Sequence, residues 1–146
     1  TLANMSGISN GKVIDTDKEY AVAEEYRKKL KTKCPTVEQN VGNLSGGNQQ
    51  KVLLAKWMFA EPDILILDEP TRGIDVGAKY EIYCIINDLV AAGKSVIMIS
   101  SELPEVLGMS DRIYIMNEGR FVGEVSGEEA TSELIMSRIV KSGKGE

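Results

Sequence analysis

Residues 44 to 69, with the sequence LSGGNQQKVLLAKWMFAEPDILILDE, decide the fold of this 146-residue chain. Ser45-Gly46-Gly47 stands near the start of this stretch, where serine is a favourable N-cap and predicts a helix over residues 46 to 60. Residues 64 to 67 are four consecutive apolar residues, a run that predicts a strand buried on both faces of a parallel sheet. Asp68-Glu69 follows the run directly, so the sequence places two carboxylates at the end of a rigid element.

The rest of the chain alternates helical and extended patterns, which predicts an α/β fold. Capping-box spacing at Thr16-Asp17-Lys18-Glu19 predicts the start of the first helix, and Gly93 stands where a C-cap glycine belongs. A two-strand hairpin is predicted around Asn117-Glu118-Gly119, with the glycine at positive φ. The other expectations are an irregular segment at 1 to 15, helices at 17 to 31 and from 76 to about 92, a loop at 34 to 42, a second buried strand at 95 to 100, a short helix at 103 to 107, hairpin strands at 112 to 116 and 120 to 125, a last helix capped by residues 126 to 129, and a disordered tail from 141.

Composition narrows the class of protein. The chain is long enough to bury a core, and 42% hydrophobic with 27% charged residues is ordinary for a soluble globular domain. A net charge of −5 argues against nucleic acid or an anionic membrane as the main partner. Cys34 and Cys84 are too few for a disulfide framework or a metal site and fit a reducing cytosol. Because residues 1 to 5 include neither an initiator Met nor a basic segment, we expect a cut inside a longer chain.

The Ser-Gly-Gly helix start has the chemistry of an anion site. Free N–H groups and the helix dipole favour phosphate there, and glycine lets a ligand approach the backbone closely. The alternative is a plain helix capped by Ser45, which the local sequence alone leaves open.

Together, these motifs resemble the ATPase of ABC transporters. The closest resemblance is to the second, C-terminal nucleotide-binding domain of the ATPase subunit of monosaccharide importers, and it covers about residues 1 to 140. It is carried by residues 43 to 56, 68 to 79 and 100 to 112. It implies a partial P-loop NTPase core with a mostly parallel sheet flanked by helices. The implied parts are a remnant of the helical subdomain at 1 to 42, the core at 43 to 125, and a C-terminal helix and tail at 126 to 146.

The resemblance implies roles for individual residues. Ser45 and Gly47 would contact the γ-phosphate of ATP seated on the opposite domain. Gly46, Asn48 and Gln49 of the same signature motif, together with Asp75, would also bind the nucleotide. Asp68 would hold Mg²⁺ through water, and Glu69 would polarise the water that attacks the γ-phosphate. Asp75 falls at the acidic position of the loop that crosses the domain interface.

One position departs from the family pattern. Ser101 stands where the family presents a histidine to the γ-phosphate, and the chain contains no histidine. Serine carries no positive charge, and the loss of such a group commonly slows a reaction by about 10²- to 10⁴-fold. We therefore expect a weakened ATP site here. An alternative role for Ser101 is to cap the following helix, and the two roles are compatible.

The glycine-rich loop that should hold the domain's own ATP is absent from these 146 residues. Gly93-Lys94-Ser95 looks like the end of such a loop, but the earlier glycine would fall at Asp88. We therefore interpret the sequence as the C-terminal part of a nucleotide-binding domain. We expect this chain alone to bind ATP poorly and not to hydrolyse it.

The resemblance also implies partners and a location. The family couples ATP hydrolysis to sugar uptake from the cytoplasmic face of the membrane, with a partner nucleotide-binding domain, a permease and an external sugar-binding protein, and without nucleic acid. Two other hypotheses remain: a soluble ABC-type ATPase acting on nucleic acid or the ribosome, and a docking module without chemistry. The sequence does not indicate which sugar is transported, because the ATPase does not contact the sugar.

Overall fold

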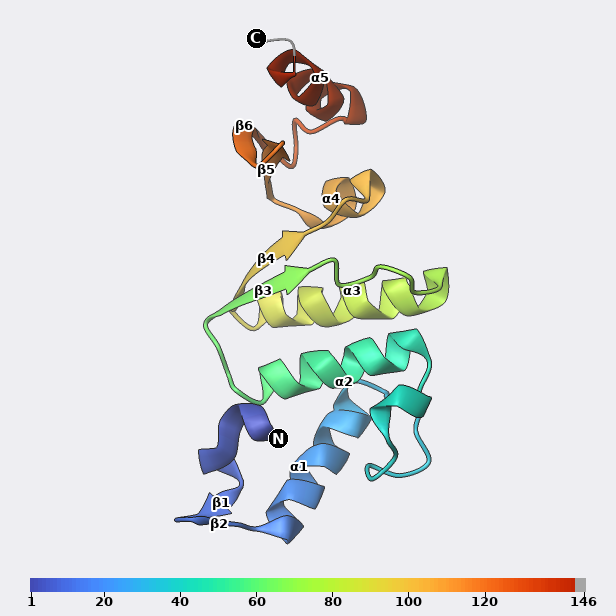
Figure 1. The fold of residues 1–146 in the computed structure, drawn as a ribbon, viewed down its shortest axis with the longest axis vertical. Coiled ribbons are helices and arrows are strands. Elements are labelled where there is room, and N and C mark those ends of the chain that lie inside the picture. Colours follow the sequence, from blue (N-terminus) through green and yellow to red (C-terminus); the bar gives the residue numbers. More distant parts are fainter. Residues whose placement is uncertain (144–146) are drawn as a thin grey trace. The chain divides into compact units, whose positions relative to one another are not determined.

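The computed structural model describes residues 1 to 143 and confirms the α/β class. The chain divides into two compact units, Thr1–Ile99 and the residues from Ser100 onward. The predicted subdomain limits at 42 and 125 are not tested by this division and remain predictions. In chain order the elements are η1 (Leu2–Gly7), β1 (Ser9–Asn10), β2 (Val13–Ile14), α1 (Thr16–Lys29), η2 (Val41–Asn43), α2 (Gly46–Met58), β3 (Ile64–Asp68), α3 (Val76–Ala91), β4 (Ser95–Ile99), α4 (Leu103–Met109), β5 (Arg112–Asn117), β6 (Arg120–Ser126) and α5 (Ser132–Ser142) (Figure 1).

The first unit is built on a parallel pair of strands, β3 and β4, in register from Ile64 opposite Ser95 to Asp68 opposite Ile99. Leu65 and Leu67 are buried on one face of the pair, together with Ile82, Ile85 and Ile86 of α3. The helices α2 and α3 lie side by side, with α1 against α2 (Figure 1). The described part of the chain therefore has one parallel pair, and its other two sheets, β1–β2 and β5–β6, are antiparallel.

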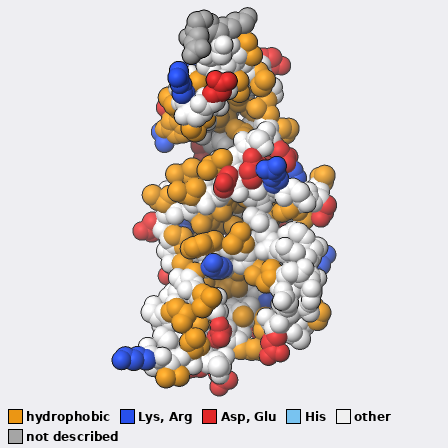
Figure 2. Space-filling model, viewed as in Figure 1, with side chains coloured by type: hydrophobic (Ala, Val, Ile, Leu, Met, Phe, Trp, Pro, Cys, Tyr) orange, Lys and Arg blue, Asp and Glu red, His pale blue; other side chains and the backbone are white. Residues whose placement is uncertain are grey.

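The expectation that both strands are buried on both faces is wrong. Four isoleucines on the second face of the pair stay half or more exposed: Ile64 at 59%, Ile66 at 63%, Ile97 at 52% and Ile99 at 50%. Hydrophobic side chains also gather over β3 and β4 in the view of Figure 2. The reason is that, among the described elements of the first unit, α3 covers one face and none covers the isoleucine face to the same extent. We call these four residues the isoleucine face.

The helix predictions for this unit hold to within a few residues, and one cap is corrected. Asp15, not Thr16, is the N-cap of α1, and its Oδ1 accepts a hydrogen bond from the Lys18 N–H at 3.1 Å. Aspartate is a better N-cap than threonine here because the positive end of the helix dipole also stabilises its carboxylate. Gly93 follows α3 at φ 85°, as predicted.

The first fifteen residues are more regular than expected. Ile8 is fully buried, and Ser9–Asn10 pairs with Val13–Ile14 in a short antiparallel hairpin. Gly11 takes the positive φ, 70°, that the turn requires. The sequence pattern missed this hairpin because each strand has two residues, too few for an alternation to be visible.

The second unit is a hairpin packed against helices. Its core consists of Ile113, Ile115 and Val125 from β5 and β6 with Ile135 from α5, and side chains of α4 pack against it. The predicted turn is confirmed, with Gly119 at φ 72° and Glu118 at φ 48°. Two successive residues at positive φ match the twist of the flanking strands.

The start and end of the last helix differ from the prediction. Ser126 and Glu129 exchange hydrogen bonds in a closed turn, and α5 begins later, with Thr131 as the N-cap that accepts from the Leu134 N–H at 3.1 Å. The helix runs to Ser142, so the predicted disorder is wrong for residues 141 and 142. Gly143 is the C-cap residue of this helix, with its N–H donating to the Lys141 carbonyl, and the predicted tail residues 144 to 146 lie outside the described residues. Within residues 1 to 143, none of the helices combines the length and the apolar character that crossing a membrane requires.

Candidate phosphate-binding site

The N-terminus of α2 is open. Ser45 is the N-cap by its backbone, since the Gln49 N–H donates to the Ser45 carbonyl at 2.9 Å, but its side chain makes no capping bond. The first N–H groups of a helix have no partner within the helix, so those of Gly46 and Gly47 are left for another acceptor. This arrangement is the first requirement of an anion site at a helix start.

Gly47 is required by packing. A Cβ on this residue would lie 2.5 Å from the Cβ of Ala78 in α3, which is closer than two non-bonded carbon atoms can approach. Gly46 is different, because its nearest contact from a Cβ would be the Gly73 carbonyl oxygen at 3.9 Å. Glycine at position 47 therefore lets the starts of α2 and α3 lie against each other.

The N-terminus of α3 opens on the same space. Asp75 is its N-cap, and Oδ1 of Asp75 accepts a hydrogen bond from the Ala78 N–H at 3.0 Å. A polar pocket of about 300 Å³ lies between the two helix starts. It is lined by Lys33, Ser45, Gly47, Asn48, Asp75, Gly77, Ala78 and Glu81. The structure thus brings together four residues predicted from the sequence: Ser45, Gly47, Asn48 and Asp75.

Lys33 and Glu81 line this pocket but were missed by the sequence reasoning. Glu81 lies on α3 three residues after Ala78, whose N–H donates to the Asp75 cap, so helical spacing from that contact could have found it. Lys33 comes from the connection after α1, and its position in the pocket depends on a tertiary contact. Its backbone N–H donates to Oδ1 of Asn48 at 2.8 Å, and no local sequence pattern predicts this bond.

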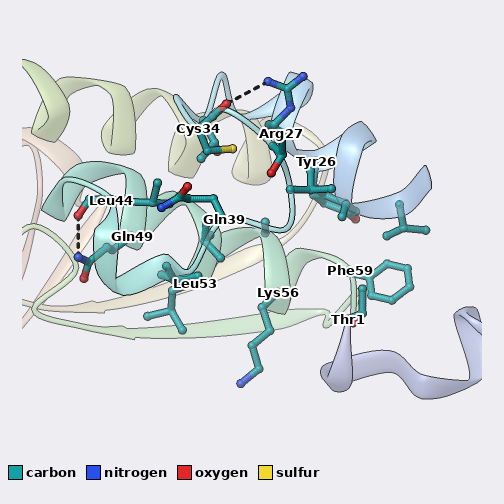
Figure 3. Close-up of a pocket in the computed structure, with 18 of the residues that line it drawn as sticks. Thr1, Tyr26, Arg27, Cys34, Gln39, Leu44, Gln49, Leu53, Lys56 and Phe59 are labelled. Carbon is teal, nitrogen blue, oxygen red and sulfur yellow. Dashed lines mark hydrogen bonds between the residues drawn. The ribbon is translucent and has the colours of Figure 1, made fainter. Parts of the chain in front are cut away.

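Gln49 does not belong to the polar pocket. Its Nε2 donates to the Leu44 carbonyl at 2.8 Å, and its side chain lines a larger, apolar pocket of about 390 Å³ between α1, α2 and the connection that joins them (Figure 3). Tyr26 and Phe59, whose rings meet edge to face, also line this second pocket. The helix turns Gln49 away from Gly47, because residues two apart do not share a helix face.

An ion pair with one buried partner ties α2 to α3 at the polar pocket. The Lys51 side chain is 3% exposed, and its ammonium lies 2.7 Å from Oε2 of Glu81, whose side chain is 49% exposed. The same ammonium donates to the Lys31 carbonyl at 3.2 Å. The hydrogen bond from Lys51, with its positive charge, holds the pKa of the Glu81 carboxyl below its usual range.

The acidic pair after β3 is held by an unusual backbone conformation. Asp68 is exposed at the end of the strand, and Glu69 has a left-handed φ of 47°. The Glu69 N–H donates to the Ile99 carbonyl at 2.8 Å, and Pro70 and Thr71 beyond it are buried. A left-handed glutamate carries a conformational cost, which these contacts offset. Neither carboxylate lines the polar pocket.

Ser101 belongs to the second unit and is exposed. The helix α4 has Glu102 as its N-cap residue, so the alternative role of Ser101 as the helix cap is wrong. The hydroxyl of the neighbouring Ser100 donates to Oε2 of Glu105 and accepts from the Glu102 N–H at 3.0 Å.

The described residues hold no gathering of three or more histidine, cysteine or acidic side chains that could ligate a metal ion. Asp68 and Glu69 are adjacent carboxylates, with Asp68 exposed and Glu69 partly buried. Magnesium in nucleotide sites uses one or two carboxylates and completes its shell with water and phosphate oxygens. The donor set at the end of β3 therefore fits a nucleotide-borne magnesium ion.

Solved structures define the class of fold. The ADP conformation of an ATP-binding cassette of an ABC transporter is similar to this chain with a TM-score of 0.72 and 27% identity, over 92% of this chain and 54% of that one. A dimeric bacterial ABC transporter cassette is similar in fold, with a TM-score of 0.67 and 24% identity, over 81% of this chain and 50% of that one. The fold is that of the ABC ATPase cassette.

Sequence comparison gives the family. The family model described as ABC transporter matches residues 3–72. The L-arabinose transport ATP-binding protein AraG of Geobacillus stearothermophilus is 63% identical over 97% of this chain, and the ribose import ATP-binding protein RbsA of Clostridium perfringens is 56% identical over 96% of it. This chain belongs to the ABC transporter ATP-binding family. It spans about 28% of the length of these two relatives.

Proposed function

We propose that this chain contributes to the ATP sites of a monosaccharide importer. In this proposal the N–H groups of Gly46 and Gly47 and the hydroxyl of Ser45 bind the γ-phosphate of ATP seated on a partner nucleotide-binding domain. The observation that carries it is the polar pocket, where the uncapped start of α2 and the start of α3 face one space. Asp75, at the edge of that pocket, would lie at the interface with the partner.

The other carboxylates would serve a second ATP. Asp68 would hold magnesium through water, and magnesium would neutralise phosphate charge there. Glu69, fixed by its backbone bond to Ile99, would orient and deprotonate the attacking water. Ser101 would face the phosphate in place of histidine, with a hydroxyl that donates one hydrogen bond and no charge. We infer that this second site is the slower of the two.

Names of the relatives support the setting. They are ATP-binding proteins for arabinose, xylose, ribose and galactose or methyl galactoside import. We propose by extension a pentose or hexose as cargo, a permease and an external sugar-binding protein as partners, and a peripheral place on the cytoplasmic face of the membrane. The solved cassette dimer supports a partner domain of similar fold.

The missing glycine-rich loop limits what this chain does alone. Without it, the β- and γ-phosphates of a nucleotide lack the backbone cradle and the lysine that most of the binding energy depends on. We expect calorimetry with millimolar Mg·ATP to detect no binding to these 146 residues and no turnover. Micromolar binding, with turnover abolished by Glu69→Gln, would contradict this expectation and reveal another phosphate-binding element.

The function is tested in cells. Ser45→Ala, introduced into the gene that encodes this sequence, should lower the uptake of one labelled monosaccharide by about 10²-fold, the usual effect of removing one oxyanion donor. The matched control is Thr131→Ala, which removes the N-cap of α5 and costs at least as much stability but touches no phosphate. Normal uptake of arabinose, xylose, ribose and galactose by the Ser45→Ala strain would overturn the proposal.

The same assay ranks the two ATP sites. Glu69→Gln should leave more uptake than Ser45→Ala, because it affects the site that Ser101 already weakens. Its matched control is Glu118→Gln, which makes the same change at a glutamate with nearly the same backbone φ, 48° against 47°. A greater loss with Glu69→Gln than with Ser45→Ala would show that the site with Ser101 is the productive one.

A further inference from the structure

Ser45 behaves unusually for a serine at a helix start. A serine N-cap normally accepts a hydrogen bond from the second or third N–H of its helix. Here Ser45 makes no such bond, and its Oγ accepts instead from Nδ2 of Asn48 at 2.8 Å. The side chain of Asn48 therefore takes the hydroxyl away from the helix backbone.

The direction of the Asn48 amide is set by its second partner. Oδ1 of Asn48 lies 2.8 Å from the backbone nitrogen of Lys33. A backbone N–H can only donate, so the amide oxygen must face Lys33 and the NH₂ group must face Ser45. With one lone pair of Oγ engaged by that NH₂, the Ser45 proton points elsewhere and is ready to donate.

We infer that Asn48 is a positioning residue that turns the Ser45 hydroxyl into a hydrogen-bond donor for the γ-phosphate. The inference rests on the proposed function and deepens it. It also changes the role of Asn48, which the sequence suggested as a direct nucleotide contact. Asn48 acts through Ser45, beside the exposed Gly46 and the buried Gly47 that lines the same pocket.

The segment around Lys33, whose N–H orients the Asn48 amide, is itself held in place. Lys51 lies one turn further along the same face of α2, and its ammonium donates to the Lys31 carbonyl at 3.2 Å. Two side chains of α2 therefore hold the segment from residue 31 to residue 33. The orientation of the Ser45 hydroxyl is fixed before a ligand arrives, which is the condition for electrostatic preorganisation.

A double-mutant cycle tests the inference on this chain. The ¹⁵N-labelled protein is titrated with Mg·ATP into the millimolar range, where NMR follows binding too weak for calorimetry, and the Gly46 and Gly47 amide shifts report the affinity. AMP, which has no γ-phosphate, is the control ligand. Ser45→Ala and Asn48→Ala should each weaken binding by about three- to tenfold, the range of one hydrogen bond. The double variant should be no weaker than Ser45→Ala alone.

A spectroscopic readout separates positioning from a structural role. Ser45→Ala should shift the side-chain NH₂ resonances of Asn48 in the absence of ligand, because their acceptor is lost. Thermal unfolding of each variant checks folding, and Asn87→Ala, at an exposed asparagine of α3 that does not line the polar pocket, is the matched control.

The outcomes are distinct. Unchanged affinity in Asn48→Ala, or losses that add in the double variant, would overturn the inference while leaving the proposed function standing. Equal shifts of the Gly46 and Gly47 amides with AMP and Mg·ATP would overturn both. No shifts with either ligand would overturn the inference for this chain and leave standing the proposed function, in which the partner domain holds the ATP.

Discussion

The two faces of the β3–β4 pair have similar chemistry and different surroundings. Leu65 and Leu67 lie under α3 and are less than a tenth exposed, whereas Ile66, between them in sequence, is 63% exposed. Large aliphatic side chains on a strand therefore do not by themselves report burial. What covers each face decides how much each side chain contributes to stability, since the free energy gained follows the apolar area removed from water.

The difference also shows where the first unit is held together. On the covered side, α3 joins the strands to α2 through the close contact at Gly47 and the ion pair of Lys51 with Glu81. Among the described elements of the first unit, none forms a comparable layer on the isoleucine face. Substitutions on the two sides should therefore have unequal effects.

The largest effect is expected from Leu67→Ala on the covered face. Removing a buried leucine side chain should lower the free energy of unfolding by about 3 kcal/mol, the transfer term plus the cavity left under α3. Urea unfolding followed by circular dichroism measures it. Ile66→Ala on the isoleucine face is the matched control and should cost less than about 1 kcal/mol. Equal losses would mean that both faces are covered in solution.

The next effect is expected at the helix contact behind the covered face. Gly47→Ala should destabilise the protein by about 2 kcal/mol, because the new methyl group overlaps the Ala78 side chain and forces α2 and α3 apart. Gly46→Ala should be neutral or slightly stabilising, since alanine is the better helix former and has room. Urea unfolding gives the free energy of unfolding of both variants. A Gly47→Ala protein as stable as wild type would contradict the close contact.

A smaller effect is expected from the ion pair that joins the same helices. Glu81→Gln should cost about 1 kcal/mol at neutral pH, at the low end for a charged hydrogen bond because the Glu81 side chain is half exposed. The pKa of Glu81 is lowered in the folded state, so this contribution is present above the unfolded-state pKa and is lost as the pH falls through the folded-state value.

Unfolding experiments at a series of acidic pH values check the sign. Wild type and Glu81→Gln should differ most near neutrality and converge at acid pH. Glu124→Gln is the control at an exposed, looser pair with Arg112, 3.8 Å apart, and should change little at any pH. A difference between wild type and Glu81→Gln that grows as the pH falls would contradict the assigned direction.

The smallest change in stability is expected from Ile66→Lys. Its free energy of unfolding should stay within about 0.5 kcal/mol of wild type, because the position is exposed. Self-association should fall, because the charge interrupts an apolar face on strands that also present open edges. Sedimentation velocity at several concentrations measures this self-association. If Ile66→Lys associates as strongly as wild type, the copies associate through a surface other than the isoleucine face.

The elements that sequence reasoning predicted well are those set by local chemistry. The start of α2 follows from Ser45 as its N-cap residue, and the β5–β6 turn follows from Gly119. The misses depend on information that a local pattern does not contain. The exposure of Ile66 depends on which elements cover the strand, and the hairpin at residues 9 to 14 is too short for a periodic signal.

The residues of the candidate site also fall into two groups, those that a local motif predicts and those that depend on tertiary contacts. The motif predicted that Ser45 and Gly47 face one space, and helix geometry explains why Gln49 does not join them. Lys33 reaches the pocket because the segment after α1 folds against α2, a contact between residues 15 positions apart. No spacing rule predicts such a bond, and it determines the orientation of Asn48.

The left-handed backbone at Glu69 has a consequence for protein engineering. Glycine takes that conformation without the roughly 1 kcal/mol that other residues lose to their Cβ. A library selected for thermal resistance alone would therefore enrich Glu69→Gly and discard the carboxylate. Directed evolution of this chain needs a selection for transport alongside heat, because position 69 is one where the more robust variant is expected to be the inactive one.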